Sequence, residues 1–429
     1  MKIKSIKAIE ILDSRSTPTL QTTVILEDGS IGSAAVPSGA STGKYEAVEL
    51  RDGDSKRFNG LGVINAINNV NTIINNTICG MDAEGQENID NKMIEIDSTD
   101  NKAKLGANAI LSVSLAVARA QAISEKIPLY QYLTKFNPDF NGTYLMPIPQ
   151  MNIMNGGKHA NWATDIQEYM ILPINFKTVK DSIRAGSEIY FNLKKLLKSK
   201  NYNTNVGDEG GFAPSVISNE EPFQLISTAI TTAGYQLGKD IFLGIDAAAS
   251  EIFNNNKYHL NKEKKDLTSV ELMNWLLDLK TRYPIISMED IFDQDDWEGF
   301  KMTTDKVKNS TQIVGDDLYV TNIKRLQMGV ENKSTNSILI KLNQIGTLTE
   351  TIKAILLARK NSMTAIVSHR SGETEDTFIA DFVVAMGTGQ IKTGAPARSE
   401  RCAKYNRLIQ IENELGEKAQ FAKFPFKIP

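Results

Sequence analysis

A chain of 429 residues can hold two domains, or one large barrel that carries an additional domain. Hydrophobic residues account for 41% and charged residues for 23%, so a core can form without disulfides or structural metal ions. The formal net charge of −3, with no basic cluster, argues against nucleic acid as a partner.

The cysteines and the N-terminus indicate a reducing compartment. Cys79 and Cys402 have no CxxC spacing, so by themselves they form neither a disulfide framework nor a zinc site. The first residues are charged, but no long apolar run follows them, and no stretch approaches the length of a membrane span. We therefore expect a cytoplasmic protein with no membrane span.

The N-terminal part of the chain has strand patterns followed by helix patterns. Apolar runs at residues 6–11 and 23–26 predict a small antiparallel sheet. Three stretches with helical spacing follow, around residues 62–79, 85–96 and 106–126. This order is typical of an α+β unit, and we place that domain at residues 1–136.

A segment of small and polar residues, 37–44, lies between these strands and helices. It suggests a P-loop, but three residues rather than four separate its glycines, and no Ser or Thr follows Lys44. The P-loop interpretation is therefore rejected. The composition fits either a mobile loop that closes over a site or an ordinary linker.

From about Met146 onward, short apolar strands alternate with longer amphipathic segments. The apolar runs are residues 169–172, 241–245, 285–288, 312–314, 338–340 and 365–367. A chemically active residue ends nearly every run, in the order Asp246, Glu289, Asp316, Lys341, His369 and Lys392. From Glu289 onward the intervals are 23 to 28 residues, which predicts a (β/α)8 barrel at residues 137–429 with its active site at the carboxyl ends of the strands.

Three of these residues, Asp246, Glu289 and Asp316, are carboxylates from successive strands. Carboxylate oxygens are hard ligands, and grouping them without a cation costs free energy by mutual repulsion. A divalent ion, most plausibly Mg²⁺, would resolve that repulsion. The alternative is that each carboxylate caps the helix that follows it.

Lys341 stands in a run, residues 337–344, that otherwise indicates a strand buried on both faces. Burial disfavours the ammonium form and lowers the pKa of a lysine, which would make Lys341 a proton acceptor near neutral pH. The alternative is an exposed strand end with an idle lysine.

Four further polar residues are candidates on weaker grounds. Glu209 lies between glycines in residues 206–211 and is either a general acid or part of an acidic surface turn. His159 and His369 fall in polar, glycine-containing sequences. Arg370 beside Ser371, with Lys392 nearby, could hold a phosphate or carboxylate, or could pair with an acidic side chain.

Taken in order, the motifs resemble those of the enolase family, of the bacterial type, along nearly the whole chain. They are residues 37–43, 155–157 with His159, 167–168, 207–211, 287–290, 315–318, 340–344, 368–374 and 390–394. The resemblance implies a Mg²⁺-dependent lyase that interconverts 2-phosphoglycerate and phosphoenolpyruvate. Its fold would be an N-terminal α+β domain, with a three-stranded antiparallel sheet and helices, followed by a (β/α)8 barrel domain. The resemblance further implies the chemistry known for this superfamily, in which a lysine or histidine base works beside Mg²⁺ ions that stabilise an enediolate.

The resemblance also implies a role for each site residue. Lys341 would remove the C2 proton and Glu209 would protonate the departing C3 hydroxyl. Mg²⁺ and Lys392 would depress the pKa of Lys341. A first Mg²⁺ would bind Asp246, Glu289 and Asp316, and a second, bound with substrate, would take Ser41 as a ligand. The substrate and pocket residues would be Arg370 and Ser371 at the phosphate, Lys392 and Gln167 at the carboxylate, and His159, Glu168 and His369 around the loop and the leaving group.

Two other interpretations remain open from the sequence. One is another member of the superfamily that removes a proton beside a carboxylate, such as a sugar-acid dehydratase, although Ser41, Arg370 and Ser371 argue for a phosphorylated substrate. The other is a scaffold or surface role added to the enzyme. Relatives lead us to expect a homodimer or an octamer built from dimers.

Overall fold

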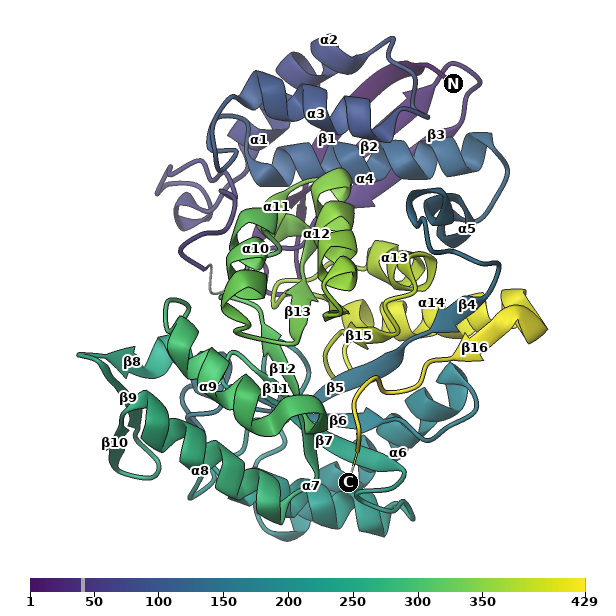
Figure 1. The fold of residues 1–429 in the computed structure, drawn as a ribbon. Helices are drawn as coiled ribbons and strands as arrows, with labels where there is room; N and C mark the ends of the chain where they lie inside the picture. The colour runs from purple at the N-terminus through teal and green to yellow at the C-terminus, as the bar shows by residue number, and fades with distance from the viewer. Residues whose placement is uncertain (40–42, 429) are drawn as a thin grey trace.

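The computed structural model describes residues 1–39 and 43–428, apart from the side chain of His159. An N-terminal domain, at the top of Figure 1, sits over a barrel domain below it. The chain leaves the first domain after the 3-10 helix η3 (Thr134–Phe136) and enters the second through β4 (Tyr144–Met146).

The N-terminal domain begins with an antiparallel meander of three strands, β1 (Ile3–Leu12), β2 (Pro18–Leu26) and β3 (Ile31–Ala35). The three-stranded antiparallel sheet expected for this domain is confirmed, with β1 and β2 at the two apolar runs located in the sequence. Helices then follow as expected: η1 (Phe58–Gly60), α1 (Ile64–Asn69), the π-helix η2 (Val70–Ile74), α2 (Asn75–Ile78), α3 (Gln86–Asp97), α4 (Ala107–Ser124) and α5 (Leu129–Leu133). The α+β prediction for this part of the chain is confirmed.

Helix α4 carries apolar residues on all of its sides, and other elements of the protein cover these sides. It packs on β2 and β3 of the meander and also contacts α5, α11 and α12. Among the described residues, it is the one helix long and apolar enough to cross a membrane, which the sequence analysis did not expect. However, 83% of this stretch is buried inside the protein, as in the core helix of a folded domain.

The barrel domain contains a closed barrel of eight strands, which confirms the predicted fold class. The strands are β5 (Ile148–Asn155), β6 (Glu168–Pro173), β7 (Ile241–Asp246), β11 (Ile285–Glu289), β12 (Gln312–Gly315), β13 (Ser337–Ile340), β14 (Thr364–Ser368) and β15 (Gln390–Lys392). One strand departs from the regular pattern: β6 runs antiparallel to both β5 and β7, while the other neighbours pair in parallel.

Helices surround the barrel, and consecutive strand residues alternate between its inside and the helix layer. Leu339 packs with Val314 and Ile366 in a separate interior cluster, whereas Ile338 and Ile340 join the large core beneath the helices. The helices are η4 (Gly157–Ala160), α6 (Val179–Ser199), α7 (Glu221–Thr232), η5 (Ala249–Ile252), α8 (Ser269–Arg282), α9 (Trp297–Val307), η6 (Lys308–Ser310), α10 (Ile323–Asn332), α11 (Leu342–Ile345), α12 (Leu348–Lys360), α13 (Phe378–Met386), α14 (Ser399–Leu415) and η7 (Gly416–Lys418). Small strands β8 (Phe253–Asn254), β9 (Lys257–Leu260) and β10 (Lys265–Leu267) form a side sheet, and β16 (Ala419–Phe421) pairs with β4.

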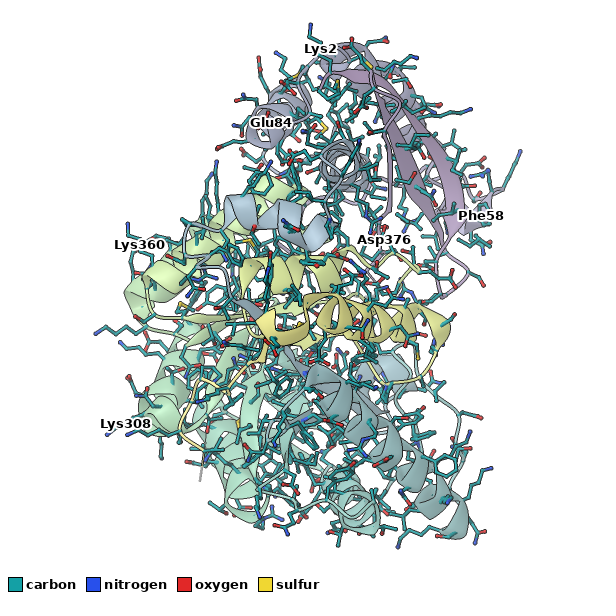
Figure 2. All side chains as sticks on the ribbon, turned by 90° about the vertical axis from the view of Figure 1, so that its right-hand side faces the viewer. Lys2, Phe58, Glu84, Lys308, Lys360 and Asp376 are labelled. Atoms are coloured by element: carbon teal, nitrogen blue, oxygen red, sulfur yellow. The ribbon has the colours of Figure 1, made fainter. Side chains whose placement is uncertain are left out.

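The two domains are joined by buried polar contacts as well as by apolar packing. Arg119 of α4 donates two hydrogen bonds to Asp376, at 2.6 and 2.7 Å, and Figure 2 shows Asp376 at the junction of the domains. Ser38 and Gly372 exchange two backbone hydrogen bonds, of 2.7 and 3.0 Å. The chain entering segment 37–44 is therefore anchored to the barrel beside His369 and Arg370.

Candidate active site

A small cavity of about 40 Å³ lies at one end of the barrel, lined by residues at and just beyond the ends of its strands. Most of the residues that the sequence analysis selected line it: Gln167, Glu168, Glu209, Asp246, Asp316, Lys341, Arg370 and Ser371. Ala248, Glu251, Asp290 and Asp317 complete the lining. Three other selected residues lie directly behind this lining. His369 contacts Glu209, Lys392 contacts Glu168 and Asp246, and Glu289 pairs with Lys392, so side chains separated by up to about half of the chain converge on one pocket.

The reversed strand β6 explains how Glu168 reaches this pocket. In a parallel barrel, functional side chains gather at the carboxyl ends of the strands. Glu168 instead begins its strand, and because β6 runs backwards its first residue pairs with Asp246, the last residue of β7, and with Asn155, the last residue of β5.

Lys392 ends β15 with its ammonium among three carboxylates of the chain itself. Its Nζ lies 2.8 Å from Glu289 Oε1, 2.9 Å from Asp246 Oδ2 and 3.1 Å from Glu168 Oε1. Burial alone would lower the pKa of Lys392, but the charges of Asp246, Glu168 and Glu289 raise it well above its usual value. Lys392 is therefore a firmly held cation.

Lys341 ends β13 and is mostly buried, with 16% of its side chain exposed, so it is not an idle lysine at an exposed strand end. Its Nζ donates to Asp316 Oδ2, and Gln344 donates to Asp316 Oδ1 at 2.8 Å. Burial lowers the pKa of Lys341, as expected, but the charges of the surrounding carboxylates, chiefly Asp316 with Glu289, together outweigh burial and the net pKa is raised. The expectation of a lowered pKa is therefore wrong for the protein without bound ions.

The pocket carboxylates fit a divalent metal ion. Within the described part of the chain, Glu289 Oε2 and Glu168 Oε2 are buried and receive no hydrogen bond. Burial and the neighbouring Asp246 raise the pKa of Glu289 well above its usual value, and burial with Asp316 raises that of Asp317 to about 7. Buried carboxylate oxygens that receive no hydrogen bond are hard donors of the kind that Mg²⁺ binds.

A second arrangement of acids overlaps the expected ligand set. Asp290, Asp316 and Asp317 each bring one oxygen atom within 4.8 Å of the others, so this triad could also hold a metal. The two oxygens of Asp290, however, already accept backbone N–H groups of Asp316 and Asp317, both at 2.8 Å. Asp290 therefore fixes the loop that presents Asp316, a contact that the sequence analysis did not predict.

Glu209 is buried, which rules out an acidic surface turn. Its Oε2 accepts a hydrogen bond of 2.9 Å from Asn152 Nδ2 and lies 3.6 Å from His369 Nε2. Asn152 belongs to β5. The sequence did not predict this strand because polar residues interrupt its apolar pattern.

Arg370 lies at the end of β14 and is paired with a residue of the N-terminal domain. Its guanidinium donates to both oxygens of Glu46, at 2.9 and 3.2 Å, and to Asn343 Oδ1 at 2.8 Å. Glu46 also accepts the backbone N–H of Gly43 at 3.0 Å. The sequence analysis missed Glu46, although it follows segment 37–44 almost directly.

Two expected residues lie wholly or partly outside the described part of the chain. Ser41 lies outside the described residues. The backbone of His159 belongs to η4, between β5 and β6, but its side chain also falls outside the description.

The comparison with known families covers nearly the whole chain. The model of the enolase N-terminal domain matches residues 3–133, and the model of the enolase C-terminal TIM barrel domain matches residues 143–427. The matches agree with the meander and helices above and with the eight-stranded barrel below. With both of its domains matched, and with a lysine and acidic side chains lining one buried pocket, the chain belongs to the enolase family.

Proposed function

We propose that this protein catalyses the reversible dehydration of 2-phospho-D-glycerate to phosphoenolpyruvate, the enolase step of glycolysis. One observation carries the proposal: a single buried pocket is lined by an amine, Lys341, a buried carboxyl group, Glu209, and a guanidinium, Arg370. Members of this family are lyases that act on small acids and depend on Mg²⁺. The pocket offers the base, the acid and the anion-binding group that this substrate needs.

Lys341 is the proposed general base. It takes the proton from C2, and the electrons of the C–H bond pass into the substrate carboxylate as an enolate. A proton beside a carboxylate is weakly acidic because its loss adds negative charge to an anionic group, so cationic groups stabilise the transition state. Lys392 is one such group, fixed in place by its three carboxylate contacts.

Asp246, Glu289 and Asp316 are the proposed ligands of a first Mg²⁺. When bound, this ion supplies positive charge to the substrate carboxylate. Asp316 has a second role, because its negative charge is the largest of the influences that raise the pKa of Lys341 and favour the ammonium form. If a bound cation shares the negative charge of Asp316, the pKa of Lys341 falls, which favours the neutral amine that proton removal requires.

Glu209 is the proposed general acid. It gives its proton to the C3 hydroxyl as the C3–O bond breaks, so that water leaves and the C2=C3 bond of phosphoenolpyruvate forms. The N–H of Asn152 then stabilises the carboxylate that remains. General acid catalysis of this kind contributes roughly 10²- to 10⁴-fold to a rate.

The remaining residues are proposed to hold the substrate. Arg370 and Ser371 take the phosphate, for which the planar guanidinium is well suited, and Glu46 must then share or release Arg370. Lys392 and Gln167 face the carboxylate end. His159, Glu168 and His369 complete the pocket, and Ser41 of the closing segment is the proposed ligand of a second Mg²⁺.

The test is a direct assay of the purified protein. With 2-phosphoglycerate and Mg²⁺ we expect ultraviolet absorbance to grow as the conjugated double bond of phosphoenolpyruvate forms, to stop with a chelator and to resume when Mg²⁺ is restored. Glycerate, which lacks the phosphate, is the matched control and should not react. Turnover of glycerate or a sugar acid, with no change for 2-phosphoglycerate, would instead indicate a dehydratase of another specificity.

A further inference from the structure

Arg401, a residue to which the reaction above gives no role, is buried beside the proposed acid. It lies in the first turn of α14 with no exposed surface. Its Nη1 donates to His369 Nδ1 at 2.5 Å and to the carbonyl of Arg370 at 2.6 Å. Its Nη2 donates to the carbonyls of Ser371 and Asp208, at 2.6 and 3.0 Å. One guanidinium therefore joins the segment that carries the proposed acid, Glu209, to the segment that carries the proposed phosphate-binding residues, Arg370 and Ser371.

The contact with His369 determines where the imidazole carries its proton. A guanidinium only donates hydrogen bonds, so Nδ1 must accept and cannot carry a hydrogen. Burial, reinforced by the charge of Arg401, lowers the pKa of His369 well below its usual value and keeps the ring neutral. The one hydrogen of the ring is therefore on Nε2.

The Nε2–H group faces Glu209. It lies 3.6 Å from Oε2, the oxygen that already accepts the N–H of Asn152. Contacts of this kind are often long before substrate binds and shorten in the reacting complex. Asn152 donates to Oε2, and the Nε2–H group of His369 is placed 3.6 Å from the same oxygen, where a small movement would form a hydrogen bond.

The packing around Gly394 shows how closely these groups fit together. A Cβ atom on Gly394 would lie 2.6 Å from the carbonyl oxygen of Glu209 and 3.1 Å from side-chain atoms of both Arg401 and His369. Gly394 also has a φ of +79°, which favours glycine. Glu209, His369 and Arg401 therefore pack so closely around Gly394 that no side chain fits at this position.

We propose that Arg401 is a positioning residue, which holds His369 in the Nε2–H tautomer so that this N–H group faces Glu209 when the acid transfers its proton. The proposal rests on the proposed role of Glu209 as general acid. It assigns to His369 the part of a fixed hydrogen-bond donor and not of a proton carrier.

The first test measures the tautomer itself. The chain has only three histidines, so selective ¹⁵N labelling gives a simple spectrum in which His369 is identified by its loss in His369→Gln. We expect a protonated Nε2, an acceptor-type Nδ1 and no titration across the neutral range. His259, exposed and paired with Asp266 at 2.7 Å, is the internal control that does titrate. A protonated Nδ1 on His369 would overturn the proposal whatever the enzyme turns over.

The second test separates positioning from general destabilisation. Arg401→Met should lower elimination of water by roughly 100-fold, while exchange of the C2 proton with deuterated solvent falls much less. Arg401→Lys, which keeps one cationic donor, should recover part of the loss. Lys404→Met is the matched control, because Lys404 is buried on the same helix and donates to Glu373 and Thr374, at 2.7 and 2.6 Å, without touching His369.

The ratio of exchange to elimination is the decisive quantity. It should rise in Arg401→Met and stay at the wild-type value in Lys404→Met. An equal fall of both rates in Arg401→Met, or an equal rise of the ratio in the control, would reduce Arg401 to a structural residue. If the wild-type protein fails to act on 2-phosphoglycerate, the proposed function fails, and the tautomer measurement still decides the hydrogen bond of Arg401.

Discussion

Lys392 and Lys341 supply the positive charge that the pocket carboxylates require in the protein alone. Each amine is buried against carboxylates, which raise its pKa against the effect of burial. The sequence could indicate Lys341, because a lysine in an apolar strand is conspicuous. It could not indicate that Asp316 would be the direct partner of Lys341, since that contact depends on the relation between two strand ends 25 residues apart.

Replacing Lys392 by methionine should make the protein depend on a divalent ion for stability. The change leaves three buried carboxylates without their ammonium, which we expect to cost about 3–5 kcal/mol. Melting temperatures in chelator and in Mg²⁺ measure this, and Mg²⁺ should restore more stability to Lys392→Met than to the wild type. Lys102→Met is the control, since Lys102 is equally buried but pairs with Glu350, 2.9 Å away, outside the pocket. Equal Mg²⁺ effects on all three proteins would contradict the proposed ion site.

Strands β5 and β6 show which elements the sequence reveals and which it does not. The apolar runs of β7 and β11 to β14 are visible because their residues are buried on both faces. Strand β5 is also fully buried, but Gln150 and Asn152 interrupt its apolar pattern, and they bond inside the barrel to Gln390 and Glu209. The reversed direction of β6 has no local signature, because a buried strand has the same pattern in either direction.

Helix α12 is capped locally by Thr347, which accepts the N–H of Glu350, and the N-terminal domain adds further hydrogen bonds at the same end of the helix. The backbone N–H and hydroxyl of Thr349 donate to Asp90 of α3, at 3.0 and 2.6 Å, and the N–H of Leu348 donates to Ser114 of α4 at 3.0 Å. Each bond satisfies a helix-terminal group that would otherwise be buried without a partner. These contacts fix the position of the N-terminal domain on the barrel.

Asp90 should make stability depend on pH. Burial raises its pKa from 3.8 to about 6. The folded protein therefore holds this proton more tightly than the unfolded chain, and the contribution of Asp90 falls as pH rises from about 4 to about 6, by at most ~3 kcal/mol. Denaturant unfolding at several pH values measures it.

The matched variant for this prediction is Asp90→Asn, which cannot ionise. Its amide can pair with the side chain of Gln86, whose Oε1 receives no hydrogen bond within the described residues. The stability of wild type relative to Asp90→Asn should fall between about pH 4 and pH 6. A difference that stays constant with pH would show that Asp90 does not titrate in this window.

The two domains share one hydrophobic core and should unfold together. A single cluster of buried residues runs from Ile3 in β1 to Ile411 in α14. Tryptophan fluorescence reports only on the barrel, because Trp162, Trp275 and Trp297 all lie there, whereas far-UV circular dichroism reports on both domains. We expect the two signals to change in one coincident transition. A separate transition seen only by circular dichroism would mean that the N-terminal domain unfolds independently.

The pocket itself is a property of the whole molecule. Arg370, which lines the pocket, pairs with Glu46 of the N-terminal domain, 324 residues away, and no local pattern could have paired them. The motifs in the sequence were enough to predict the site residues at the ends of the barrel strands. Their partners Glu46, Asn152 and Arg401 could be identified only from the structure. The expected homodimer, or octamer of dimers, remains a prediction, and sizing the purified protein in solution tests it.

The exchange of the C2 proton of 2-phosphoglycerate with deuterated solvent tests the division of work between Lys341 and Glu209 most directly. Glu209→Gln should lose formation of phosphoenolpyruvate but still exchange this proton, because Lys341 acts before the acid does. Lys341→Ala should lose both exchange and turnover. Exchange that persists in Lys341→Ala, or that disappears in Glu209→Gln while Lys341 is intact, would contradict these roles.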